Sequence, residues 1–237
     1  MFSSLTGTWV FLVTPFIDDG VQDTVAGEMF DWVAGRGGRP EDSIRGLFRQ
    51  IVEGMRYMHS MGVCHADMSL ENALIDRDGH PYIIDFGMSL LMPIAKDGRR
   101  YMSVGDRRRA KASYCTPEGF DHRDYDGVKV DVFAAGAMLF MMLCGFPPFS
   151  AATRADSGFR RIVCQRDVNG LLRSYGKAEL SDDAVDLLTS MMALDPELRP
   201  IPEEALAHPW FNPPPPPQVV PVADLVDAEP AGVAAVA

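Results

Sequence analysis

The 237-residue sequence has neither a long apolar run nor a basic leader. Its longest apolar run, residues 132–144, is too short to cross a bilayer, which takes about 20 residues, and predicts a buried core helix. The N-terminal stretch MFSSLTGTWVFLVTPFI is apolar, but it lacks the basic segment and small-residue cleavage site of a signal peptide. These absences predict a cytoplasmic protein without a membrane partner, and they leave a nuclear location open.

An excess of basic residues is missing as well. The chain has 33 acidic and 22 basic residues, for a net charge of -11, which argues against a nucleic-acid partner. Its four cysteines are scattered without metal-ligand spacing and are expected to be reduced thiols. The 47% apolar and 23% charged residues are typical of a soluble globular protein with an ample core.

Residues 64–89, CHADMSLENALIDRDGHPYIIDFGMS, predict a β-hairpin. The apolar run 73–76 forms the first strand, and residues 81–84 form the returning strand. Residues 77–80 between them contain a glycine, which tolerates the positive φ of a tight turn.

Three oxygen-bearing side chains flank this hairpin. Asp67 and Asn72 lie just before the first strand, and Asp85 lies just after the second. Because the strands are antiparallel, all three can converge at one end of the hairpin. Two carboxylates and an amide are suitable ligands for a hard cation such as Mg²⁺.

Periodicity predicts two amphipathic helices elsewhere in the chain. Residues 42–61 carry apolar side chains at helical spacing and end before Gly62, and residues 182–192 repeat the pattern. Residues 87–117, by contrast, are polar and show no clear period. A long irregular segment in a compact domain is usually functional or disordered.

The segment HADMSLEN at 65–72, followed by DFG at 85–87, resembles the catalytic and magnesium loops of the protein kinase family. The family patterns are H-R-D-x-x-x-x-N and D-F-G. Further family motifs have their counterparts at 116–118 (A-P-E), 131–136 (D-x-W-S-x-G), 145–149 (G-x-P-P-F), 194–200 (L-D-P-x-x-R-P) and 205–211.

The resemblance covers residues 9–211 and implies an α+β, protein kinase-like fold. A predominantly α-helical large lobe at 27–211 would carry the short β-hairpin at the catalytic site. Residues 9–17 would be a remnant β-strand of the small lobe running into the hinge. Together, residues 1–211 would form the kinase-like domain, and residues 212–237 a Pro-rich disordered tail.

Three roles follow from the resemblance for the flanking oxygens. Asp67 matches the catalytic base, which accepts the proton of the substrate hydroxyl. Asn72 and Asp85 match the metal ligands that hold Mg²⁺ against the phosphates of ATP.

The ATP side of the site is implied in the same way. Thr14 matches the gatekeeper, and Phe16 and Ile17 match the hinge that packs against adenine. Below the adenine, the family places a column of apolar residues, matched here by Met29, Leu74, Met138 and Met142.

The resemblance also assigns supporting roles. His65 matches a packed, hydrogen-bonded position, and Asp131 matches the acceptor of backbone N–H groups of the catalytic loop. Glu118 and Arg199 match a buried ion pair that ties the irregular segment 87–117, the activation segment, to the base of the lobe.

Three residues depart from the family pattern. Ala66 replaces the Arg of H-R-D, and Ser69 replaces a Lys that contacts the γ-phosphate two residues after the base. Lys111, seven residues before Glu118, replaces a Thr that in the family bonds to both the base and this Lys. We hypothesise that Lys111 reaches into the space left by Ser69 and restores the cation beside Asp67, as a further catalytic residue.

Two functions remain open. The first is a Ser/Thr protein kinase that transfers the γ-phosphoryl group of Mg-ATP to hydroxyls of a protein substrate. The second is a catalytically inactive binding module, with the five prolines from Pro213 to Pro217 as a ligand for SH3- or WW-type domains. The presence of Asp67, Asn72 and Asp85 favours the first function, which is the leading hypothesis. The family's Gly-rich loop, strand Lys and helix Glu have no counterpart before Trp9, which favours the second function for this chain as an N-terminally truncated domain.

Overall fold

The computed structural model describes residues 27–33, 37–93, 101–102, 111–120 and 125–213. The helices are α1 (Met29–Val33), α2 (Glu41–Ser60), α3 (Pro117–Phe120), α4 (Gly127–Cys144), α5 (Ser157–Phe159), α6 (Val168–Ser174), α7 (Asp182–Met191) and α8 (Pro202–Leu206). Short 3₁₀ or π turns are η1 (Leu70–Asn72), η2 (Phe86–Met88), η4 (Arg160–Cys164), η5 (Pro196–Leu198) and η6 (Pro209–Phe211). The strands are β1 (Gly27–Glu28), β2 (Val63–Cys64), β3 (Ala73–Ile75), β4 (Pro81–Ile83), β5 (Leu90–Leu91), β6 (Tyr101–Met102) and β7 (Tyr125–Asp126).

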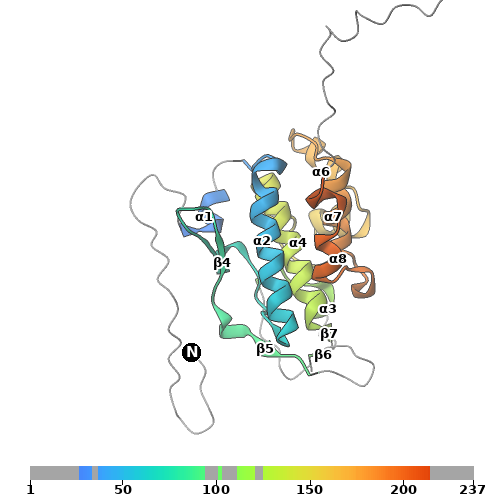
Figure 1. The fold of residues 1–237 in the computed structure, drawn as a ribbon. Coiled ribbons are helices and arrows are strands. Elements are labelled where there is room, and N and C mark those ends of the chain that lie inside the picture. The colour runs from blue at the N-terminus through green and yellow to red at the C-terminus, as the bar shows by residue number, and fades with distance from the viewer. Residues whose placement is uncertain (1–26, 34–36, 94–100, 103–110, 121–124, 214–237) are drawn as a thin grey trace, which may run out of the picture.

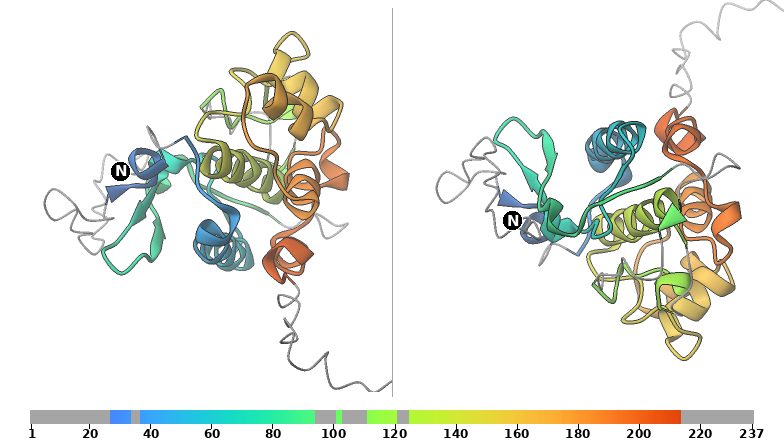
Figure 2. Two further views of the ribbon diagram at one scale, coloured as in Figure 1. Left: turned by 90° about the horizontal axis from the view of Figure 1, so that it is seen from above. Right: turned by 90° about the horizontal axis from the view of Figure 1, so that it is seen from below.

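Helices α2 and α4 lie side by side at the centre of the molecule (Figure 1). The hairpin β3–β4 and α1 lie on one side of this pair, and α6, α7 and α8 lie on the other, as both views in Figure 2 also show. Helix α7 packs against α4, and α8 packs against α2. This mostly helical arrangement agrees with the fold class predicted from the sequence.

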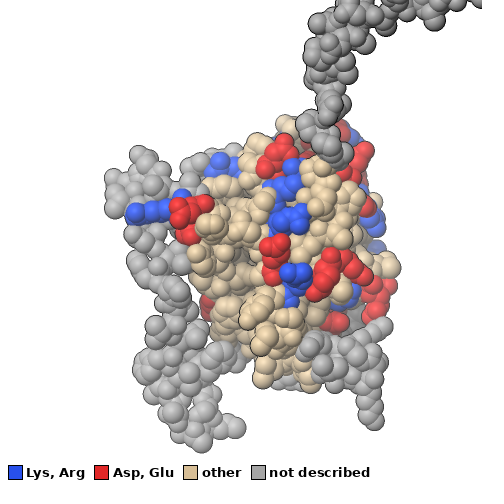
Figure 3. All heavy atoms as spheres, in the orientation of Figure 1, with Lys and Arg blue, Asp and Glu red and all other residues tan. Residues whose placement is uncertain are grey.

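Helix α2 is amphipathic, as predicted. Its apolar side chains are buried on one face, and they are Ile44, Leu47, Phe48, Ile51, Val52, Met55 and Met58. On the opposite face, basic and acidic side chains are intermixed (Figure 3). The helix therefore turns its apolar stripe to the core and its charged stripe to solvent.

Helix α4 is apolar on all sides and is the core helix expected from the sequence. It runs over 18 residues, from the N-cap Asp126, which accepts a hydrogen bond from Val128 N (2.8 Å), to Gly145 in the left-handed conformation. By length and composition it could cross a membrane, but 89% of it is buried inside the domain. Burial, rather than shortness, identifies it as a core helix.

The chain approaches the end of α4 closely just before α2 begins. Gly38 has a φ of +94°, and a Cβ atom there would lie 2.1 Å from the carbonyl oxygen of Leu143. The next residue, Arg39, donates its backbone N–H to Met142 O (2.9 Å). The glycine at position 38 thus allows the start of α2 to lie close to the end of α4.

The predicted hairpin is present. Strands β3 and β4 are antiparallel with Leu74 opposite Tyr82, and β1 adds a third strand by pairing with the other edge of β3. The turn has Gly79 at a φ of +84°, as expected for a residue that must adopt positive φ.

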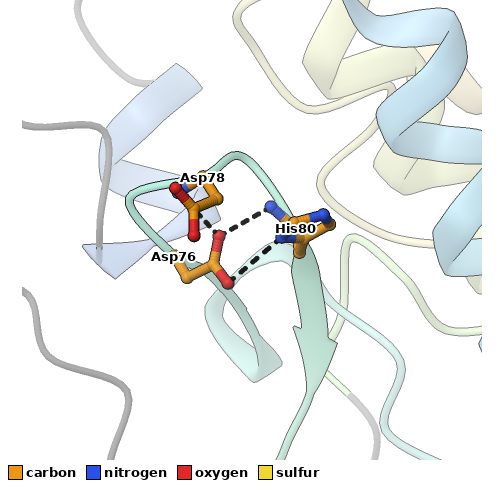
Figure 4. Close-up of side chains that lie close together, drawn as sticks. All are labelled: Asp76, Asp78 and His80. Carbon is orange, nitrogen blue, oxygen red and sulfur yellow. Dashed lines mark hydrogen bonds and ion pairs between the residues drawn. The ribbon is translucent and has the colours of Figure 1, made fainter.

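The Asp76 carboxylate organises the hairpin turn (Figure 4). Its Oδ1 accepts hydrogen bonds from the backbone N–H groups of Asp78 (3.0 Å) and His80 (2.8 Å), and its Oδ2 accepts one from the Tyr82 hydroxyl (3.0 Å). These bonds lower the pKa of Asp76, and the bond from His80 N has the largest effect. Asp76, Asp78 and His80 are close enough to hold a cation, but the turn geometry alone accounts for their proximity.

Glu118 and Arg199 form the predicted buried ion pair. The guanidinium donates to both carboxylate oxygens, at 2.5 and 2.9 Å, and the two side chains are 7% and 0% exposed. Arg199 also donates to the carbonyl oxygens of Ala193 (2.8 Å) and Lys129 (3.1 Å). The pair therefore fixes α3 to α4 and to the end of α7.

Some sequence predictions fall outside the described residues. These are the strand and hinge at 9–17, with Thr14, Phe16 and Ile17, and the tail beyond Pro213. They stay predictions.

Substituting Glu118→Gln should unfold the protein more readily. The variant leaves the Arg199 charge buried without its counter-ion, which costs about 3–5 kcal/mol. Urea denaturation followed by circular dichroism measures the loss. The matched control is Glu179→Gln in the exposed Arg173–Glu179 pair (2.8 Å), which should leave the unfolding midpoint nearly unchanged. Equal effects at both positions would contradict this role for Glu118.

Candidate active site

The buried Asp131 carboxylate holds the start of the 64–72 loop. Its Oδ2 accepts hydrogen bonds from His65 N (2.8 Å) and from His59 Nε2 (2.9 Å). Its Oδ1 accepts a hydrogen bond from Ala66 N (2.9 Å). With an exposed fraction of 0%, Asp131 has no water to replace these donors. Its predicted role as acceptor for the loop is confirmed.

His65 connects the loop to the residue before Asp85. Its ring is buried, and Nε2 lies 2.9 Å from the carbonyl oxygen of Ile84. The ring also packs against Phe86, with a centroid separation of 5.1 Å. His65 is therefore packed and hydrogen-bonded, as predicted.

Two residues of this region adopt the left-handed backbone conformation. Ala66 has a φ of +62° and Asp85 a φ of +57°. For a residue with a Cβ, this conformation costs about 1–2 kcal/mol, and such strain gathers at functional sites. The Asp131 bond to Ala66 N helps to hold the first of them.

Asn72 fixes the Asp67 side chain. Its Nδ2 donates to the Oδ2 of Asp67 (2.8 Å) and to the carbonyl oxygen of Asp67 (2.8 Å). Asn72 is buried, whereas Asp67 is half-buried. The base predicted from the sequence is thus oriented by the amide of a predicted metal ligand, and it remains partly exposed to solvent.

The hairpin brings Asn72 and Asp85 to one end. Ile84 donates its N–H to the carbonyl oxygen of Asn72 (2.9 Å), which places Asp85 directly beyond that pair. Asp85 is exposed, and its Oδ1 accepts from Gly87 N (3.2 Å). Among the described residues its Oδ2 makes no hydrogen bond, so this oxygen is available to a cation. The oxygens of Asn72 and Asp85 are a suitable donor set for Mg²⁺.

Apolar residues pack beneath the hairpin. Met29, Met138 and Met142 are buried, and Leu74 on β3 is half-buried. The three methionines belong to the main core cluster. The structure thus shows them as core residues, and the contact of all four residues with adenine stays a prediction.

Lys111 reaches the position predicted for it, but not the predicted carboxylate. Its Nζ donates to the Oγ of Ser69 (2.7 Å) and lies 3.5 Å from Asn72 Oδ1. Its ion pair is with Glu71, at 3.7 Å. Within the described residues Lys111 makes no ion pair with Asp67, whose Oδ2 accepts a hydrogen bond from the Asn72 amide. The expected direct contact with Asp67 was therefore wrong.

Tyr114 and Glu71 were not identified from the sequence. The Tyr114 hydroxyl donates to Glu71 Oε2 (3.0 Å) and accepts from Leu70 N (3.3 Å). Burial, and then the Glu71 charge, raise the pKa of Tyr114 well above its usual value. Lys111 and Tyr114 thus fasten residues 111–114 to the loop. A tyrosine in an irregular segment gives no sequence signal for such a contact.

The loop, the hairpin and the buried ion pair together define the large lobe of a protein kinase. Comparison with known proteins agrees: a family model, protein kinase domain, matches residues 8–211. The chain belongs to the protein kinase family.

Its curated relatives are protein kinases, and several of them are named serine/threonine kinases. The chain is 33% identical over 206 residues to a probable serine/threonine-protein kinase of Dictyostelium discoideum, covering 87% of this chain and 22% of that protein. It is 32% identical over 187 residues to CBL-interacting protein kinase 5 of Oryza sativa subsp. japonica, covering 78% and 38%. It is also 32% identical over 189 residues to calcium/calmodulin-dependent protein kinase type 1 of Caenorhabditis elegans, covering 78% and 51%.

Asp131→Asn should destabilise the loop. Whichever way the new amide turns, its NH₂ group faces a backbone N–H of His65 or Ala66, and each unsatisfied buried donor costs about 1–3 kcal/mol. Chemical denaturation measures the stability, and hydrogen exchange at His65 and Ala66 measures the loop.

The control is Asp195→Asn, at an exposed N-cap that accepts from Glu197 N (3.0 Å). Asparagine caps about as well as aspartate, so this variant should behave as wild type. Unchanged exchange at His65 in Asp131→Asn would contradict the anchoring role.

Proposed function

We propose that this chain transfers the γ-phosphoryl group of Mg-ATP to serine or threonine hydroxyls of a protein substrate. The observation that carries the proposal is the orientation of Asp67 by Asn72 at the end of the hairpin that also positions Asp85. Membership of the kinase family supports it. The chain spans about a fifth to a half of the length of these relatives.

The chemistry assigned to Asp67 is that of a general base. Its carboxylate accepts the proton of the substrate hydroxyl as the hydroxyl oxygen forms a bond to the γ-phosphorus. The bond from that phosphorus to the β–γ bridging oxygen breaks, and ADP leaves with the electron pair. The Asn72 amide keeps the carboxylate oriented, so that reaching the transition state costs little orientational entropy.

Asn72 and Asp85 would hold the metal. Mg²⁺ bound there supplies positive charge that offsets the charge on the phosphate oxygens. Asn72 Oδ1 has only a long contact of 3.5 Å to Lys111, so it keeps the capacity to bind a cation.

The alternative function, an inactive binding module, has less support. The residues assigned as base and metal ligands, Asp67, Asn72 and Asp85, are all present, and Asp67 and Asn72 are held together by two hydrogen bonds. A ligand role for Pro213 to Pro217 toward SH3- or WW-type domains stays a prediction, since residues 214–217 lie outside the described part of the chain.

Asp67→Asn should remove phosphoryl transfer. A general base contributes about 10²- to 10⁴-fold to the rate, so transfer from radiolabelled ATP to a generic protein substrate should fall by at least that lower factor. Asp78→Asn, an exposed residue of the same hairpin, is the matched control and should retain the wild-type rate. An inactive wild-type chain, or an unimpaired Asp67→Asn variant, would overturn the proposal.

Asp85→Asn should weaken the magnesium dependence of ATP binding. Titration calorimetry with Mg²⁺ should show an affinity at least about tenfold lower than for wild type, because one metal ligand loses its charge. Binding in the presence of a chelator should be unchanged. Equal weakening with and without Mg²⁺ would show that Asp85 acts on the nucleotide without the metal.

A further inference from the structure

The Lys111 ammonium lies against the loop of the candidate active site, although Lys111 comes from a different segment than Asp67. It donates to Ser69 Oγ at 2.7 Å, and Ser69 is only 1% exposed. Ser69 follows Asp67 by two residues, so the ammonium lies beside the loop that carries the base. Its distance to Asn72 Oδ1, 3.5 Å, places it next to the proposed metal ligand.

The negative charge around Lys111 indicates what its ammonium group could do at this position. Asp67, Glu71 and Asp85 are acidic, and a nucleotide triphosphate would add further negative charge. A cation aimed at the transferred phosphoryl group lowers the energy of its transition state. Among the described residues, Lys111 is the cation recorded in contact with residues 69–72.

The contacts of Lys111 hold its side chain in place but leave part of its hydrogen-bonding capacity unused. The Lys111 and Glu71 side chains are 38% and 32% exposed, and their 3.7 Å separation makes a loose ion pair. Tyr114 takes the same Glu71 oxygen at 3.0 Å. The ammonium has three donors, and one strong hydrogen bond to Ser69 leaves donors for an incoming anion.

We propose that Lys111 is the residue that contacts the γ-phosphate. Relative to the family pattern, the ammonium and the hydroxyl have exchanged places between positions 69 and 111. The hydroxyl lies on the catalytic loop and the ammonium on the 111–118 segment, opposite to the arrangement that the family resemblance implies. The assignment rests on one part of the proposed function, the binding of Mg-ATP with its γ-phosphate at this site.

The exchange makes phosphate contact depend on how the 111–118 segment is seated. Tyr114 and Glu118 hold that segment through Glu71 and Arg199. A cation on the loop would be present whenever the loop is folded. A cation at position 111 is present only when the segment is docked as well.

Nucleotide binding provides a test that needs no turnover. Lys111→Thr should weaken Mg-ATP binding by about ten- to a hundredfold, the effect of losing one hydrogen bond to a charged group. Binding of Mg-ADP, which has no γ-phosphate, should change by less than about twofold. Calorimetry of the full chain measures both. A matched control is Lys177→Thr, an exposed lysine, which should bind both nucleotides as wild type does.

A double-mutant cycle tests the exchange itself. Ser69→Lys alone should also impair ATP binding, since it places a second ammonium against Lys111. The double variant Ser69→Lys, Lys111→Thr moves the cation to the loop and should recover the ATP affinity to within about threefold of wild type. The comparison of ATP with ADP separates a phosphate contact from a tether, because loss of a tether between segment and loop would weaken the binding of both nucleotides.

Two outcomes would overturn the assignment. One is equal loss of ATP and ADP affinity in Lys111→Thr, and the other is a double variant no better than Lys111→Thr. Neither bears on the proposed function. Conversely, a wild-type chain that prefers ATP through Lys111 but transfers no phosphoryl group would sink the proposed function and leave the assignment standing.

Discussion

The structure of the site depends first on one buried carboxylate. Asp131, on the central helix α4, accepts hydrogen bonds from His59, from His65 N and from Ala66 N. A buried, ionised oxygen that lost these donors would be strongly unfavourable, so the loop and the helix must stay together. Through His65 and Ile84, the same anchor reaches the hairpin end where Asp85 lies. The positions of the candidate catalytic side chains therefore follow from the packing of α4.

A second constraint holds the 111–118 segment from both ends. At one end Glu118 is locked to Arg199 by two hydrogen bonds. At the other, Tyr114 and Lys111 contact the loop residues Glu71 and Ser69. The first contact is a buried ion pair and costs several kcal/mol to break, whereas the Lys111–Glu71 pair is partly exposed and loose. The segment is thus fixed firmly to the base of the lobe and more weakly to the candidate active site.

Sequence reasoning succeeded where a periodic pattern or a short motif decides the structure. The apolar spacing of residues 42–61 located α2 nearly to its ends, and the turn glycine located the hairpin. The two-residue strand β1 could not be predicted, because its pairing with β3 uses backbone groups and leaves no side-chain pattern. The contacts of Lys111 and Tyr114 with Glu71 join residues about forty positions apart, and no local propensity reports such a distance.

The error over Lys111 shows why a site is harder to predict than a fold. The family resemblance correctly implied that positions 69 and 111 meet, but it could not say how the donors near Asp67 are shared. Asn72 Nδ2 has two N–H donors, and it donates one to the side-chain oxygen and one to the backbone oxygen of Asp67. The Asn72 Oδ1 atom then faces Lys111. Competition among three polar groups within a few ångströms decides which carboxylate a cation reaches. That competition depends on geometry that only the folded chain contains.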